Sequence, residues 1–223
     1  MKKILFVTSE AVPFIKTGGL ADVAGSLPKY FDKEKYDVRV MLPKYMCMKD
    51  EWKEKLEYVT HFYMDLSWRQ QYVGILKMEY DGVTFYFIDN EFYFNGFAPY
   101  GDMYADIEKF AFFSKAVLSA LPMIDFRPDI IHCHDWQAGL VPVFLDNFRY
   151  GNEWYRGIKT VMTIHNLKFQ GTWDTKRVRD ITGLPQYYFA PDKLEAYKDA
   201  NFLKGGIVYA DRITTVSNTY AQE

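Results

Sequence analysis

Short apolar runs alternate along this chain with stretches in which apolar residues recur at helical spacing. Residues 3–8, KILFVT, are apolar and partly β-branched, a pattern typical of a buried strand. Residues 36–43, YDVRVMLP, form a second run of this kind. Between them the apolar positions follow the period of a helix, at Leu20, Val23, Ala24, Leu27 and Phe31. A strand–helix–strand unit predicts a parallel sheet with a right-handed crossover.

The same alternation continues toward the end of the chain. Predicted helices cover 46–58, 107–121, 140–150 and 172–184, and predicted parallel strands lie within 127–140 and at 159–166 and 212–216. The pattern favours one α/β domain over 1–223, with a Rossmann-like parallel sheet flanked by helices.

An antiparallel insertion interrupts the parallel pattern. Strands are predicted at 59–66, 71–79 and 83–88, with Asp81-Gly82 as a hairpin turn. Residues 90–106, rich in Tyr, Phe, Asn and Gly, are predicted to form a long loop. Loops of that length in compact domains are commonly functional.

Composition narrows the classes of function. About half of the 223 residues are hydrophobic and a quarter are charged, which is an ordinary globular balance with enough apolar material for a core. The formal net charge is −2 without a basic run, so neither nucleic acid nor a membrane is expected as a partner. Cys47 and Cys133 make no disulfide framework, and no apolar run is long enough to span a bilayer. A cytoplasmic protein is expected.

Residues 16–19, KTGG, lie between the first predicted strand and the first predicted helix. The first N–H groups of a helix have no intrahelical partner, and together with the helix dipole they attract anions. Gly18 and Gly19 would let the backbone approach a ligand closely, and Lys16 adds a mobile positive charge. A diphosphate is the expected ligand, although the same four residues also fit a plain tight turn with a solvated lysine.

A dinucleotide-binding unit is the main alternative for this opening. Such units carry G-x-G-x-x-G in the first turn and an acidic residue at the end of the second strand. Here the turn holds Gly18-Gly19 and then Gly25, and the second strand ends Met41-Leu42-Pro43. An NAD enzyme is therefore disfavoured.

Polar residues follow the third predicted parallel strand. Ligands of open α/β sheets bind beyond the carboxyl ends of the strands, where His134, Asp135 and Trp136 would lie. Because residues two apart share a face of a strand, His132 and His134 are also candidate metal ligands, together with Asp135. No distant histidine pair completes a zinc set, so no metal site is expected. Cys133 points to the opposite face and is expected to be buried.

Four separated strings carry a resemblance to a known family: EAVPFIKTGGLADV at 10–23, RPDIIHCHDWQAGL at 127–140, TIHNLKFQG at 163–171 and NFLKGGIVYADRITTVS at 201–217. In this order they resemble the bacterial glycogen synthases and plant starch synthases, which have the two-domain GT-B fold. The sequence departs from the family pattern with Lys109, where arginine is usual, and with Gln137, where many members carry histidine. Gln137 is assigned no catalytic role.

The resemblance implies retaining transfer of glucose from ADP-glucose to the non-reducing end of an α-1,4-glucan, with no metal or cofactor. Lys16 and His165 would be catalytic. Lys16, with the backbone of Gly18 and Gly19, would meet the diphosphate, and His165 would hold the donor glucose and steady the charged anomeric carbon. The other implied substrate-binding residues are Asn166 beside His165, Asp135 and Trp136 on the acceptor side, Asp22 in the first helical turn, and Lys204. Asp22 equally fits a partner of the helix dipole, and Lys204 equally fits a surface lysine. Carboxylates paired at glycosidase spacing are not evident, so a covalent intermediate is not supported.

The resemblance covers only the first of the family's two Rossmann-like domains. The C-terminal nucleotide-binding domain has no counterpart in 1–223, and the helix start indicated by Ser217-Asn218-Thr219 has room for barely one turn. The chain is therefore expected to be the acceptor-side half of the enzyme, inactive alone, with the choice between ADP and UDP donors left open. The alternative is a non-catalytic glucan-binding module.

Overall fold

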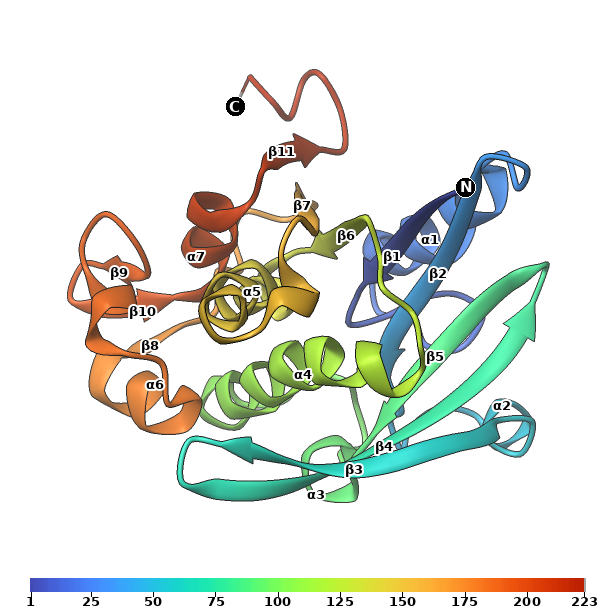
Figure 1. Ribbon diagram of the computed structural model, residues 1–223, viewed down its shortest axis with the longest axis horizontal. Helices are drawn as coiled ribbons and strands as arrows, with labels where there is room; N and C mark the ends of the chain where they lie inside the picture. Colours follow the sequence, from blue (N-terminus) through green and yellow to red (C-terminus); the bar gives the residue numbers. More distant parts are fainter. Residues whose placement is uncertain (223) are drawn as a thin grey trace.

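The computed structural model describes residues 1–222 of the chain. Eight strands form one sheet in the order β11–β7–β6–β1–β2–β5–β4–β3 (Figure 1). Their bounds are β1 Lys2–Val7, β2 Tyr36–Pro43, β3 Glu57–Leu66, β4 Arg69–Tyr80, β5 Val83–Asp89, β6 Ile130–His134, β7 Lys159–Ile164 and β11 Arg212–Thr215. The pairings from β11 through to β5 are parallel, and β5–β4 and β4–β3 are antiparallel. The predicted parallel sheet with an antiparallel insertion is confirmed.

The order of the strands reverses at β1. The chain first places β2 on one side of β1 and later places β6 on the other side. Val7, the last residue of β1, lies opposite Met41 of β2 and Cys133 of β6. Open α/β sheets bind ligands at such a reversal, beyond the carboxyl ends of the strands. Cys133 is fully buried, as predicted.

Helices and a small second sheet complete the fold. The helices are α1 Gly19–Ser26, α2 Asp50–Lys53, α3 Glu91–Phe94, α4 Met103–Met123, α5 Leu140–Gly151, α6 Thr175–Thr182 and α7 Phe202–Tyr209, with short 3₁₀ turns at Leu27–Tyr30, Trp136–Ala138, Glu153–Tyr155 and Gln186–Phe189. Helix α4 packs against α5, and α5 packs against α7. The second sheet, β8 Thr172–Asp174, β10 Asp199–Asn201 and β9 Glu195–Ala196, lies beside α6 at the left of Figure 1. The helix predicted from 172 therefore begins with a strand, because these residues pair with β10.

Helix α4, 21 residues long, supplies much of the core. Its predicted apolar face, which includes Phe110 and Phe113, is fully buried. The helix starts earlier than predicted because the carboxylate of Asp102 accepts hydrogen bonds from the N–H groups of Tyr104 and Ala105. That cap ends the loop that precedes the helix and so fixes the position of the loop.

Two predicted elements are wrong in part. The helix predicted over 46–58 is reduced to the four residues of α2. From Glu57 onward the chain pairs with β4, where Glu57 lies opposite Lys77, and this pairing overrides the local helical spacing. The loop predicted over 90–106 contains α3, because the side chain of Asn90 caps two N–H groups at its start.

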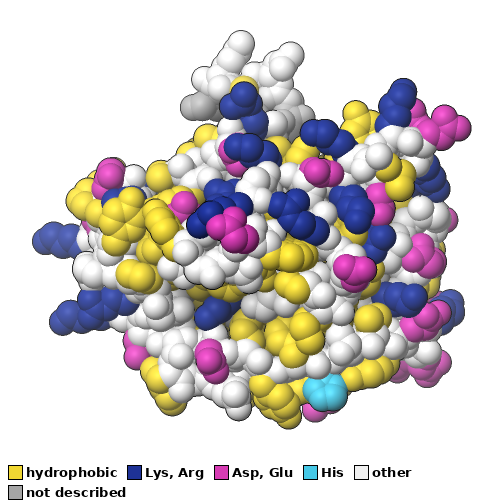
Figure 2. Space-filling view, in the orientation of Figure 1, with side chains coloured by type: hydrophobic (Ala, Val, Ile, Leu, Met, Phe, Trp, Pro, Cys, Tyr) yellow, Lys and Arg dark blue, Asp and Glu magenta, His cyan; other side chains and the backbone are white. Residues whose placement is uncertain are grey.

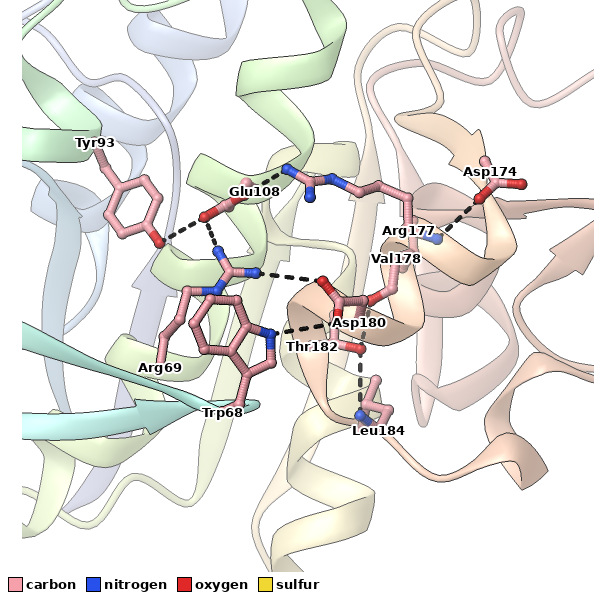
Figure 3. Close-up of polar contacts among 10 residues, drawn as sticks. All are labelled: Trp68, Arg69, Tyr93, Glu108, Asp174, Arg177, Val178, Asp180, Thr182 and Leu184. Atoms are coloured by element: carbon pink, nitrogen blue, oxygen red, sulfur yellow. Dashed lines mark hydrogen bonds and ion pairs between the residues drawn. The ribbon is translucent and has the colours of Figure 1, made fainter.

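A partly buried carboxylate joins the hairpin of β3 and β4 to the helical layer (Figure 3). Glu108 of α4 lies between Arg69 of β4 and Arg177 of α6 and forms an ion pair with each. The hydroxyl of Tyr93 donates a further hydrogen bond to the same carboxylate at 3.0 Å. These contacts connect elements that are far apart in the sequence.

The surface carries charges of both signs. Lys and Arg side chains are interspersed with Asp and Glu over the face shown in Figure 2, in keeping with the formal net charge of −2. Within residues 1–222, the helices are all too short or too polar to cross a membrane.

Candidate active site

A cavity of about 740 Å³ opens where the strand order reverses. Segments that follow β1, β6 and β7 form its walls, together with the first turn of α1 and the loop before α4. Six of the nine predicted site residues line it: Gly18, Gly19, Asp135, Trp136, His165 and Asn166. The reversal of the sheet thus gathers residues from three distant strings of the sequence.

The N-terminus of α1 faces the cavity through two glycines. Gly18 is the N-cap residue, and no side chain of the described residues caps this helix. No atom of residues 1–222 lies within 4 Å of the position that a Cβ would take on Gly18 or Gly19. Gly25 differs, because a Cβ there would collide with the backbone of Val12. Gly25 therefore allows close packing of the helix, whereas Gly18 and Gly19 leave the first N–H groups of α1 accessible to a ligand.

Lys16 and Asp22 lie beside this turn and outside the lining of the cavity. The Nζ atom of Lys16 is 2.7 Å from Oδ2 of Asp22, and each side chain is 53% exposed. Thr17, the next residue, lines the cavity. Because exposed ion pairs contribute little free energy, the ammonium group can turn from Asp22 to an anion in the cavity at small cost.

Glu10 holds the glycine turn in place through hydrogen bonds. Its buried carboxylate accepts hydrogen bonds from the N–H and the hydroxyl of Thr17 and from the hydroxyl of Tyr100. The hydroxyls of Ser9 and Tyr100 are 2.6 Å apart. Burial raises the pKa of Tyr100 far above its ordinary value, with the charge of Glu10 adding to the shift. Glu10 thereby ties the turn before α1 to the loop before α4.

Lys109 and Asp106 hold the other end of that loop. The ammonium group of Lys109 is 2.6 Å from Oδ1 of Asp106 and donates to the carbonyl oxygen of Pro99 at 3.0 Å. Oδ2 of Asp106 accepts a hydrogen bond from the N–H of Gly101. Lys109, the departure from the family pattern, therefore acts on the loop and is itself buried, outside the lining of the cavity.

Asp135 follows β6 in a backbone conformation that few side chains adopt, with φ 56° and ψ −175°. Its Oδ1 accepts hydrogen bonds from the N–H of His165 at 2.7 Å and from the N–H of Asn166 at 3.3 Å. Burial raises the pKa of this carboxyl to about 6, against the lowering effect of the two N–H groups. Asp135 thus joins the ends of β6 and β7 and fixes the backbone of the two predicted donor-site residues.

Three histidines, His132, His134 and His165, form a cluster of which only His165 lines the cavity. Nε2 of His165 is 2.9 Å from Nδ1 of His134, which is fully buried. The ring of His134 stacks on His132 with centroids 4.3 Å apart, and Nε2 of His132 is 2.6 Å from the hydroxyl of Thr163. Burial lowers the pKa of His132 and of His165 to about 4 and lowers the pKa of His134 well below its ordinary value. The rings are therefore neutral at pH 7. Within residues 1–222, no three His, Cys, Asp or Glu side chains are arranged to hold a metal ion.

Comparison with known proteins places this site in a family. Residues 3–223 match the starch synthase catalytic domain. The chain belongs to this family. It is 70% identical over 223 residues to a glycogen synthase of Lachnospira eligens, covering 100% of this chain and 47% of that protein. It is 50% identical over 221 residues to a glycogen synthase of Desulforamulus reducens, covering 99% of this chain and 46% of that protein.

A solved member of the starch synthase family has the same fold. The catalytic domain of starch synthase IV from Arabidopsis thaliana, bound to ADP and acarbose, matches with a TM-score of 0.81 at 28% sequence identity. The match covers 100% of this chain and 46% of that one. The chain thus spans about half the length of the relatives it matches.

Two glycines of the family strings serve packing around Trp136. A Cβ on Gly171, which has a φ of +63°, would collide with the Trp136 indole, and a Cβ on Gly139 would collide with the backbone of Phe202. Trp136 is only 4% exposed and packs edge-on to Phe110 at 5.2 Å. The indole is therefore part of the cavity wall and of the core at once.

Lys204 lies away from the cavity lining. It is on α7, and its ammonium group donates hydrogen bonds to the carbonyl oxygens of Pro191 and Glu195. These bonds hold the segment between the 3₁₀ turn at Gln186–Phe189 and β9. The predicted contact of Lys204 with an acceptor stays a prediction.

Sequence reasoning missed the residues that support the site. Glu10 and Tyr100 line the cavity and bond to each other, and Asp106 lines it from α4. Glu10 opens the first family string, so its acidic side chain before a glycine turn was a usable signal. Tyr100 and Asp106 lie in or beside a loop whose course no local pattern predicts.

Proposed function

We propose that this chain is the N-terminal, acceptor-side half of a glycogen synthase, which transfers glucose with retention from ADP-glucose to the non-reducing end of an α-1,4-glucan in the cytoplasm. Membership of the starch synthase catalytic domain family and the glycogen synthase relatives support this proposal. One observation carries it: Gly18 and Gly19 face the same cavity as His165 and Asp135. A second Rossmann-like, nucleotide-binding domain would close the cavity from the other side.

The donor diphosphate would bind at the start of α1. The exposed N–H groups there, the open space at Gly18 and Gly19, and the helix dipole favour an anion. The ammonium of Lys16 would leave Asp22 and pair with the departing diphosphate, while Asp22 keeps Lys16 near the turn. Charge that develops on the leaving group would be stabilised by groups already in place.

The donor glucose would lie against the segment after β7. His165 and Asn166 line the cavity there, with their backbone held by Asp135. A neutral His165 would bind sugar through hydrogen bonds and would place no positive charge beside a cationic anomeric carbon. Asp135 and Trp136 would line the acceptor side.

The full-length protein tests this proposal. Incubation with a glucan primer and either ADP-glucose or UDP-glucose should give glucose transfer, with ADP-glucose preferred. The substitution Lys16→Ala should lower kcat by about 100-fold, because one preorganised charge on the leaving group is lost. The thermal midpoint should change little, since the Lys16–Asp22 ion pair is exposed.

Matched controls separate the outcomes. Lys176→Ala removes an exposed lysine on α6 and should leave kcat unchanged. A full-length protein that binds glucan but transfers no glucose from either donor would support the alternative, a non-catalytic glucan-binding module. An unchanged kcat in Lys16→Ala would remove the diphosphate role from this residue.

A further inference from the structure

His134, the buried histidine next to His165, has a hydrogen-bond partner for only one of its two ring nitrogens. Nδ1 of His134 is 2.9 Å from Nε2 of His165, and the His134 residue has no exposed surface. Nε2 of His134 is also buried and has no hydrogen-bond partner among residues 1–222. The ring is packed between aromatic neighbours, with Phe6 at 5.3 Å and His132 at 4.3 Å between centroids.

The single partner distinguishes the two neutral tautomers of His134. A neutral imidazole has one N–H donor and one acceptor nitrogen. If His134 carried its proton on Nε2, a buried N–H would be without a partner, and orphaned N–H donors are rarer in native structures than acceptors with unused lone pairs. If the proton is on Nδ1, it is donated to His165 and the partnerless atom is only an acceptor. The second arrangement is therefore favoured.

We propose that His134 is a positioning residue that donates its Nδ1–H to Nε2 of His165 and so fixes His165 in the tautomer with its proton on Nδ1. Nε2 of His165 is engaged by His134, which leaves Nδ1 as the ring nitrogen available to the cavity that His165 lines. The cavity then receives an N–H donor, which recognises a hydroxyl or phosphate oxygen. That last consequence rests on the proposed function; the tautomer itself does not.

The other neighbours of the rings agree with this assignment. Burial keeps all three histidines of the cluster neutral at pH 7, so tautomer choice rather than charge decides what His165 offers. The main-chain N–H of His165 is bonded to Asp135, which holds the residue in place while His134 sets the ring. His132 engages Thr163, and Thr163 is 2.7 Å from the hydroxyl of Thr214, so the back of the cluster is also fixed.

Nitrogen NMR of the full-length protein tests the tautomer directly. In protein labelled with ¹⁵N-histidine at pH 7, two-bond correlations should show a protonated Nδ1 and an unprotonated Nε2 for His165, and the same for His134. The His165→Gln variant assigns the His165 signals by their loss. A protonated Nε2 on His165 would overturn the proposal, and this measurement requires neither enzyme activity nor a substitution at His134.

Two substitutions then test the role of His134. His134→Phe keeps an aromatic ring but removes the donor, and it should leave His165 as a mixture of tautomers and lower kcat by about 10-fold to 100-fold with a smaller change in KM, because a misoriented group costs most in the transition state. His134→Asn places an amide donor near the Nδ1 position and should restore both the single tautomer and most of kcat. His61→Phe, at an exposed histidine of β3, is the matched control and should change neither.

The outcomes separate this inference from the proposed function. A single Nδ1–H tautomer in a protein that transfers no glucose would leave the inference standing and would refute the function. A folded His134→Phe protein that transfers glucose with an unchanged kcat and an unchanged His165 spectrum would support the function and refute the inference.

Discussion

Glu108 and Asp135 are both carboxylates with little exposed surface, and their surroundings are opposite. Glu108 is paired with two guanidinium groups, of Arg69 and Arg177, and its side chain is 13% exposed (Figure 3). Asp135 is 7% exposed and accepts hydrogen bonds from two backbone N–H groups, and within residues 1–222 no cationic side chain forms an ion pair with it. One carboxylate joins secondary-structure elements, and the other keeps an uncompensated charge beside a cavity.

The difference indicates which carboxylate serves the fold and which serves the site. A charge matched by two cations makes removal of the carboxylate costly, because the cations would remain without it. A charge held by neutral donors is unfavourable to the fold, as the raised pKa of Asp135 shows. Groups with such perturbed pKa values cluster at functional sites. Substitution of Glu108 should therefore reduce mainly the stability, and substitution of Asp135 should reduce mainly the activity.

The largest effect on stability is expected for Glu108→Ala. Loss of the carboxylate leaves Arg69 and Arg177 close together and partly buried, and removal of one member of a buried ion pair costs about 3 kcal/mol. Urea unfolding of the protein measures the loss. Asp180→Ala, at a carboxylate that is 52% exposed and 3.9 Å from Arg69, is the control and should cost less than about 0.5 kcal/mol. Equal effects of the two substitutions would contradict the structural role of Glu108.

Of the two carboxylates, Asp135 is expected to have the larger effect on activity, tested by Asp135→Asn. The amide oxygen can still accept the N–H groups of His165 and Asn166, and asparagine has the size and branching of aspartate, so the substitution makes no new demand on the backbone. Removal of a buried charge should leave the free energy of unfolding at pH 7.5 unchanged or raise it by about 1 kcal/mol, while kcat falls by about 100-fold. Asp129→Asn, at the other end of β6, also retains an acceptor for a backbone N–H and should leave kcat unchanged. A large loss of stability in Asp135→Asn would break the contrast with Glu108.

The pH dependence of stability sharpens the comparison. The pKa of His132 and of His165 is about 4 in the folded chain and about 6.5 when unfolded, so the unfolded state binds protons first and stability is lost as pH falls from 6.5 to 4. Asp135 acts in the opposite direction: its pKa is about 6 when folded, so it binds a proton first in the folded state and stabilises the fold as pH falls from 6 to 4.

Asp135→Asn should therefore steepen the loss of stability on acidification. Urea unfolding at pH 7, 6 and 5 should show a decrease in the free energy of unfolding that is larger in the variant by on the order of 1 kcal/mol. Asp129→Asn again serves as the control. An equal decrease in wild type and variant would mean that the pKa of Asp135 is not raised in the folded protein.

The sequence predicts the sheet and the place of the site for a physical reason. Strands read from apolar runs are buried on both faces, and in a parallel sheet their carboxyl ends meet, so Gly18, Asp135 and His165 converge although they are far apart in the chain. The supporting bonds follow another logic. Pairs such as Glu10–Tyr100 and Arg69–Glu108 join segments 90 and 39 residues apart, and no local pattern specifies them. The start of β3 at Glu57, two residues before the predicted strand 59–66, was missed for the same reason, since its pairing partner decides it.

The smallest effect is expected where a cation, rather than a carboxylate, is already satisfied by the fold. The ammonium group of Lys204 bonds to the carbonyl oxygens of Pro191 and Glu195, so Lys204→Met, which keeps the apolar stem, should cost about 1 kcal/mol of stability for the lost hydrogen bonds. If these bonds are its main role, the KM for glucan will stay within about twofold of wild type, whereas an acceptor contact would raise KM by about 5-fold to 10-fold with kcat unchanged. Lys193→Met, at the nearby lysine that lies over the Tyr187 ring, removes a second ammonium from the same surface and is the control. A KM for glucan that rises in Lys204→Met and not in Lys193→Met would show that Lys204 serves the site, as Asp135 does, and not only the fold, as Glu108 does.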